Sequence, residues 1–195
     1  MSESLNKRLD YLGIADMDYL SARLLLLSGL THTGLAKASE AFEKLLKLFF
    51  LLEAKINSDS ELEKNEVEKY RHQLVKLFCY IRTKIPAVFD DSWIEYFQEL
   101  ERAYKLRYPE SWKESKLTND LERLDKAYCY FRNGVILNFP QEESKKTKEF
   151  GTFIYRAYSQ EIIGKIKQLG SLTPKEIFYK NNESAQDFVL DFHKL

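Results

Sequence analysis

Apolar residues recur along this chain at alternating steps of three and four positions. Such spacing places side chains on one face of an α-helix, whereas a strand would need apolar residues at every second position. The clearest row steps by 3, 4, 3, 4 and 3 and predicts a helix over residues 33–55. Its members are Leu35, Ala38, Phe42, Leu45, Phe49 and Leu52.

Prolines, glycines and short polar runs divide the pattern into helices. We expect five core helices with short connections, the first joined to the second by a turn over residues 31–34. They are predicted at about 16–29, 33–55 and 61–85, then from a cap at Asp91 or Ser92 to Arg107, and from a cap at Thr118 to Pro140.

The remaining residues predict a helical extension. An aromatic-rich helix is expected over 142–169, and Thr173-Pro174 is typical of a helix start, with a cap followed by proline at the first helical position. A short helix then runs through Tyr179, and 184–194 form a last amphipathic turn or two. The predicted fold is all-α: an up-down helical bundle of about five core helices over 1–139, with a C-terminal helical extension over 140–195 that packs on the bundle or on a partner subunit.

Composition narrows the classes of partner. Seven glycines and four prolines are too few for a many-stranded protein, and 30 basic residues balance 30 acidic ones. A neutral chain has no global field that attracts nucleic acid or a membrane surface, so DNA is not expected as a partner and RNA would need a local basic patch. Zero net charge also favours protein partners or self-association.

Two further features concern the compartment. The sequence contains no apolar run of membrane-spanning length, so no membrane association is expected. Cys79 and Cys129 are isolated in apolar helical patterns, which predicts free buried thiols in a reducing compartment, and hence a cytoplasmic protein.

Four short motifs resemble those of HEPN domains (higher eukaryotes and prokaryotes nucleotide-binding domains), in the order in which that family shows them. They cover roughly residues 12–138. An acid followed by "L-x-x-A" in 18–25 looks like the first helix of the family, and 38–47 resembles "A-x-x-A-x-E-K-x-x-K". Residues 71–77 are similar to "H-D-L-x-x-L" with Gln73 in place of Asp, and Arg107-Tyr108-Pro109 matches "R-Y-P".

The resemblance implies an up-down bundle, frequent homodimerisation, and association with nucleotides or RNA. Many members are ribonucleases that carry "R-N-x-x-x-x-H". Here Arg132-Asn133 begins such a string, but Asn138 stands where the histidine would be. Because an amide cannot accept and donate a proton near neutral pH, we expect a catalytically degenerate module.

Each candidate residue also has a structural explanation. His72 could bind phosphate or transfer a proton, or it could cap or pack at the start of its helix. Arg107 could face a polar groove with Tyr108, or hydrogen-bond the last carbonyls of its helix. Arg132 and Asn133 belong either to a site or to a solvated helix face.

The sequence therefore predicts a nucleotide- or RNA-binding or protein-interaction module that forms a homodimer. No histidine pair has metal-ligand spacing and no phosphate-loop motif occurs, so neither a metal nor a cofactor is expected. One alternative is a metal-independent, toxin-like ribonuclease that uses Arg132, Asn133 and His72; another is a structural adaptor that docks through its C-terminal aromatic helices. The candidate contacts for a nucleotide, RNA or cognate protein are Arg71, His72, Arg107, Tyr108, Arg132, Asn133 and Asn138.

Overall fold

The computed structural model of the chain describes residues 3–56, 69–70, 72–84, 90–107, 118, 120–137 and 172–188. Within these ranges all regular elements are helical and no strand occurs, which confirms the all-α fold predicted from the apolar spacing. The α-helices are α1 (Glu3–Leu27), α2 (Thr31–Ile56), α4 (Leu74–Lys84), α5 (Ile94–Lys105), α6 (Leu121–Leu137) and α10 (Pro174–Tyr179). Two 3₁₀ turns, η2 (Asp91–Trp93) and η4 (Glu183–Asp187), accompany them.

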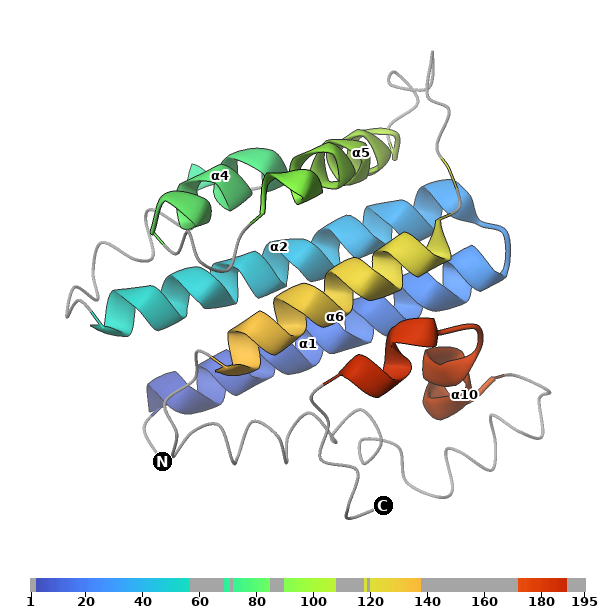
Figure 1. The fold of residues 1–195 in the computed structure, drawn as a ribbon, viewed down its shortest axis with the longest axis horizontal. Helices are drawn as coiled ribbons and strands as arrows, with labels where there is room; N and C mark the ends of the chain where they lie inside the picture. Colours follow the sequence, from blue (N-terminus) through green and yellow to red (C-terminus); the bar gives the residue numbers. More distant parts are fainter. Residues whose placement is uncertain are drawn as a thin grey trace.

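The bundle is organised around a long antiparallel hairpin of α1 and α2 (Figure 1). Helices α4 and α5 lie along α2, on its side away from α1, and α6 packs against both members of the hairpin. The last two elements close the other side, because α10 contacts α1 and η4 contacts α6.

Phe42 lies at the centre of the core. Its ring is fully buried, and its centroid lies 5.4–5.9 Å from the rings of Tyr96, Phe97, Tyr128 and Phe131. These edge-on contacts join α2 to α5 and α6, and each aromatic pair contributes about 0.5–1.5 kcal/mol beyond area burial. The apolar row of the second predicted helix therefore faces the core of the bundle.

The first two helices differ from the prediction at their ends. Helix α1 begins at Glu3, well before the predicted start at Asp16, because Leu12 and Ala15 continue its buried row. Gly29, with φ +77°, follows the end of α1 as expected. The predicted turn over 31–34 is wrong, because α2 already starts at Thr31.

Gly34 serves close packing and not a turn. A Cβ added to it would lie 2.7 Å from Cγ of Leu26 on α1, closer than real Cβ contacts allow. The absence of a side chain at this position thus lets α1 and α2 approach each other where they leave their connecting turn.

The third predicted helix is interrupted. The backbone N–H of Gln73 donates to the carbonyl of Tyr70 at 3.1 Å, His72 has a left-handed backbone with φ +56°, and α4 begins only at Leu74. A left-handed residue cannot continue a right-handed helix, so the apolar periodicity crosses the break without revealing it. The rest of that predicted helix, over 61–68, lies outside the described residues.

Helix caps were predicted with mixed success. The Thr173 hydroxyl accepts a hydrogen bond from the backbone N–H of Glu176, and the Glu176 carboxylate accepts one from the backbone N–H of Thr173, so the predicted helix start is confirmed as a capping box. The other two caps lie one and two residues from the predicted positions. Asp90 accepts from the N–H of Ser92, and Asp120 from the N–H of Arg123.

Candidate functional site

Arg132, a predicted site residue on α6, lies inside the bundle. Its Nε is 2.9 Å from Oδ1 of Asp16 and its Nη2 is 3.1 Å from Oδ2, and the two residues are 1% and 2% exposed. The hydroxyl of Tyr128 donates to the same carboxylate at 2.7 Å. Arg132 therefore belongs neither to a solvated helix face nor to a surface that a ligand can reach.

A second buried ion pair lies beside the first. Arg23 of α1 pairs with Asp125 of α6, whose carboxylate also accepts from the hydroxyl of Tyr19 at 2.8 Å. Burial raises the pKa of Asp125, although Arg23 and Tyr19 act in the opposite direction. The rings of Tyr19 and Tyr128 stack with centroids 4.0 Å apart, so the two ion pairs form one buried network.

The C-terminal residues complete this network. Nε of Arg23 donates to the carbonyl of Ile177 at 3.0 Å, and Nη2 donates to the carbonyl of Lys180 at 2.5 Å. Nδ2 of Asn182 donates to the hydroxyl of Tyr19 at 3.2 Å. Residues 172–188 thus pack on the bundle of their own chain, and the network they close is structural.

Asn133, the other residue of the predicted ribonuclease string, also has a structural contact. Its Nδ2 donates to the carbonyl of Asp187 at 2.7 Å, which ties α6 to η4. Sequence reasoning overlooked Asp16 and Asp125, the carboxylates of the buried network. The sequence did contain a signal, because both aspartates occur in apolar helical rows. In the structure they are 2% and 1% exposed.

The residues that do gather at the surface surround Tyr104, near the end of α5. The imidazole of His72 stacks on its ring with centroids 4.6 Å apart, and the guanidinium carbon of Arg107 lies 3.5 Å from the ring centroid. Nε2 of His72 is 3.3 Å from the Tyr104 hydroxyl. With Glu40 and Glu43 of α2, these residues form what we name the Tyr104 cluster.

The two glutamates of the Tyr104 cluster orient its cationic and imidazole groups. Oε2 of Glu43 lies 3.1 Å from Nδ1 of His72, and Oε1 of Glu40 accepts from Nη1 of Arg107 at 2.9 Å. Nε of Arg107 also donates to the carbonyl of Tyr104 at 3.2 Å, so the contact with a carbonyl at the helix end is confirmed. His72 and Arg107, 35 positions apart in the sequence, are thus held on one aromatic ring.

The cluster presents side chains that a ligand can reach. The side chains of His72 and Arg107 are 53% and 36% exposed. Through Glu40 and Glu43 the cluster connects to further ion pairs. The connected group holds four permanent cations and three carboxylates: Lys37, Lys44, Lys47 and Arg107, with Asp18, Glu40 and Glu43.

The other predicted contacts, Arg71, Tyr108 and Asn138, lie outside the described residues. Of the four that are described, the structure brings together His72 and Arg107, and separates both from the buried Arg132 and from Asn133. Arg132 therefore does not share a site with His72 and Arg107, because it is bound to Asp16 within the core.

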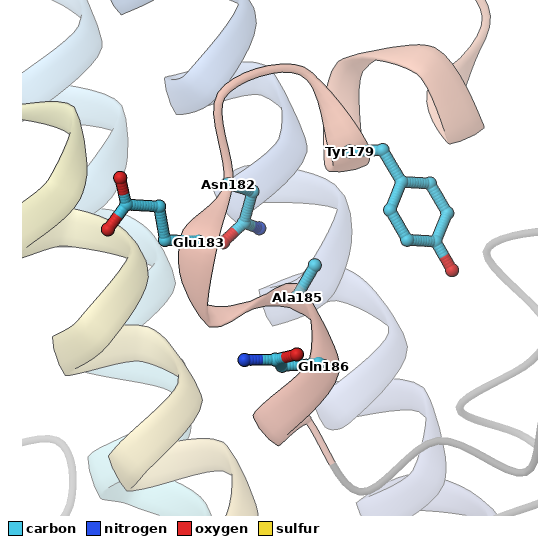
Figure 2. Close-up of a pocket in the computed structure, with 5 residues that line it drawn as sticks. All are labelled: Tyr179, Asn182, Glu183, Ala185 and Gln186. Carbon is cyan, nitrogen blue, oxygen red and sulfur yellow. The ribbon is translucent and has the colours of Figure 1, made fainter.

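An open pocket of about 650 Å³ lies over η4. It is lined by Tyr179, Asn182, Glu183, Ala185 and Gln186, and Figure 2 shows Tyr179 and Glu183 pointing to opposite sides. Ligand pockets usually have a few polar groups that converge on one volume. This pocket lacks that convergence.

The described residues contain no group of three or more His, Cys, Asp or Glu able to hold a metal ion. Both cysteines are free; Cys79 is half-buried, whereas Cys129 is buried, and burial raises the pKa of the Cys129 thiol to about 11. A thiol with so high a pKa is a poor nucleophile at neutral pH. No helix in the described ranges has the length and apolar character that crossing a membrane requires.

Comparison with protein-family models, with curated proteins and with solved structures finds no match for this chain.

Proposed function

We propose that this chain is a HEPN-like binding module that recognises a phosphate-bearing nucleotide ligand, RNA or a free nucleotide, through the Tyr104 cluster. The observation that carries the proposal is the convergence of His72 and Arg107 on Tyr104. Two distant motifs of the resemblance, "H-D-L-x-x-L" and "R-Y-P", supply these residues, and they meet on one exposed surface.

The chemistry of the cluster suits this class of ligand. A guanidinium group binds phosphate oxygens through charge-assisted hydrogen bonds, and the side chain of Arg107 is 36% exposed, so a ligand can reach it. The imidazole of His72 and the guanidinium of Arg107, each of which lies on the Tyr104 ring, are planar groups on which a base can stack. Cations outnumber carboxylates by one in the connected ion pairs, so the group as a whole does not repel a phosphate.

In this proposal the module binds the nucleotide or RNA, and Arg132 takes no part in cleavage. This residue is 1% exposed and paired with Asp16, so it cannot approach a phosphodiester unless the core opens. The homodimer and the cytoplasmic location expected from the sequence remain part of the proposal.

Binding can be tested by fluorescence anisotropy with a labelled single-stranded RNA and, separately, a labelled adenine nucleotide at low salt. We expect Arg107→Ala to weaken binding of the preferred probe at least about tenfold, the loss typical of one charge-assisted contact. Arg102→Ala is the matched control, because Arg102 is an exposed arginine on α5, the helix that Arg107 follows. Absence of affinity for both probes would refute the proposal. An equal loss of affinity in Arg107→Ala and Arg102→Ala would show that the binding site is not the Tyr104 cluster.

A second candidate is a metal-independent ribonuclease centred on His72. It is favoured by the 3.1 Å contact between Glu43 and Nδ1 of His72, because a carboxylate on one ring nitrogen orients the other as a proton acceptor. In this mechanism Nε2 would exchange its contact with the Tyr104 hydroxyl for the attacking 2′-hydroxyl and take its proton as the 2′-oxygen bonds to phosphorus. The bond from phosphorus to the 5′-oxygen would break, the leaving oxygen would take a proton from water, and Arg107 would hold the phosphate.

Incubation of purified protein with total RNA separates the two candidates. Cleavage by the native chain that is lost in His72→Ala and in Arg107→Ala would establish the ribonuclease. Binding without cleavage would support the non-catalytic module. The third possibility, an adaptor that docks through residues 142–195, concerns a segment that lies mostly outside the described residues.

A further inference from the structure

Helix α1 is apolar on both of its sides. The side towards the core carries Leu12, Tyr19 and Leu26, which are 0–2% exposed. The opposite side, which we name the outer face of α1, carries Ile14, Met17, Ser21, Leu24 and Ser28 at helical spacing.

The three large side chains of the outer face are well exposed: 50% for Ile14, 39% for Met17 and 40% for Leu24. An outward helix face usually carries charged residues, and a helix that is apolar all round is normally covered on both sides. This face therefore has the composition of an interface, although no other described element covers it.

The two hydroxyls of the outer face do not oppose its burial. Oγ of Ser21 donates to the carbonyl of Met17, and Oγ of Ser28 donates to the carbonyl of Leu24, both at 2.8 Å. Because these groups are paired within the helix itself, a partner can cover them without leaving an unsatisfied donor.

We propose that the outer face of α1 packs against the same face of a second copy of this chain. The homodimer is part of the proposed function, and this proposal names the surface through which it forms. It rests on the proposed function for the dimer alone and not for the ligand. The arrangement is an antiparallel pair of α1 helices related by a two-fold axis at Ser21.

The spacing of the outer face is self-complementary under this symmetry. Ser21 meets its own copy on the axis, where its small side chain permits close approach of the helices. Met17 meets Leu24 of the other copy, and Ile14, a large residue, meets Ser28, a small one. A two-fold interface requires this matching of a surface with itself.

Charge and size are consistent with a weak dimer. The outer face has no charged residue between positions 14 and 28, and the chain has a formal net charge of zero, so two copies do not repel each other at long range. The face is about 21 Å long at 1.5 Å per residue. One helix pair of this length buries less than the roughly 800 Å² per partner of standard interfaces, so we expect association in the micromolar range.

Sedimentation equilibrium of the full chain tests the dimer. At tens of micromolar we expect a mass approaching twice the 23.1 kDa of one chain. Leu24→Glu should raise the dissociation constant at least about tenfold, because it places a charge in the contact. Gln98→Glu, an equal change in charge at an exposed position on α5, should leave the constant unchanged.

Disulfide trapping tests the symmetry. In Ser21→Cys, mild oxidation should give a disulfide-linked dimer, because the two residues meet on the axis; the native chain and Gln98→Cys should not form it. A monomer at these concentrations overturns the proposal, and so does a dimer that Leu24→Glu leaves intact and Ser21→Cys does not trap. RNA binding, measured separately, tells the two failures apart: a monomer that binds RNA refutes only the outer-face dimer, and a dimer that binds neither probe refutes only the ligand proposal.

Discussion

Arg132 and Asp16 form a buried ion pair between α6 and α1, with Nε 2.9 Å from Oδ1 and both side chains at most 2% exposed. The two residues are 116 positions apart in the sequence, so the pair joins distant helices. Because Tyr128 donates to the same carboxylate, removal of Arg132 would leave Asp16 charged in the core with only a phenol as partner.

Arg132→Ala should lower the free energy of unfolding by about 3–5 kcal/mol, the usual cost of breaking a buried ion pair by removing one partner. Urea denaturation followed by circular dichroism measures this change. Combining Asp16→Ala with Arg132→Met should recover part of the stability, since it removes both charges. If Arg132→Ala lowers the free energy of unfolding by less than about 1 kcal/mol, Arg132 and Asp16 do not form a buried ion pair. Any loss of RNA cleavage in this variant would therefore reflect its fold as well as its chemistry.

His72 carries a left-handed backbone with φ +56°. Glycine adopts this conformation freely, whereas residues with a Cβ bear about 1–2 kcal/mol of strain. We expect His72→Gly to be more stable than His72→Ala by about 1 kcal/mol in thermal or urea unfolding, because both lose the imidazole contacts and only glycine relieves the backbone. The same pair of substitutions at Gln73, where φ is not positive, should favour alanine. Equal stability of the two His72 variants would contradict the left-handed turn.

Thr173 and Glu176 form the capping box of α10, with both reciprocal hydrogen bonds present. Thr173→Ala should lower the free energy of unfolding by about 1 kcal/mol, and Thr173→Ser should lower it much less because it keeps the hydroxyl. Hydrogen exchange should show faster exchange at the amides of Ile177 and Lys180, whose bonds close the short helix. Unchanged exchange in Thr173→Ala would mean that packing on α1 alone holds α10 in place.

Cys129 should be nearly inert towards iodoacetamide in the folded protein at about pH 8, because the thiolate is the reactive form and burial raises the thiol pKa to about 11. The half-buried Cys79 is the internal comparison and should react first, as mass spectrometry can resolve. Cys129 should react only after denaturation. Comparable rates for the two thiols in the native protein would contradict the burial of Cys129.

The same thiol makes stability fall at high pH. Its folded pKa of about 11 lies above its ordinary value of 9.0, so the unfolded chain loses this proton at lower pH than the folded chain does. The contribution of Cys129 to stability is therefore fully present below about pH 9 and decreases as pH rises towards 11. Replacing Cys129 with alanine should flatten this part of the pH profile.

The sequence by itself determined the helical class and most of the helices. Apolar steps of three and four positions define which side of each helix leaves water, and this local pattern does not depend on the partner helix. It also identified the Thr173 cap and the end of α1 near Gly29, which are local too. It could not locate the break at His72, because one left-handed residue leaves the apolar periodicity on either side intact.

Tertiary structure alone decided which polar residues are available for function. Arg132 lies on the amphipathic α6 and Arg107 just after the amphipathic α5. Nothing in their neighbouring residues shows that one is paired with Asp16 inside the core while the other lies at the surface on Tyr104. The physical reason is that a charged side chain is buried only when a counter-charge meets it there. That counter-charge comes from a distant helix, so the arrangement of the helices determines where each arginine lies.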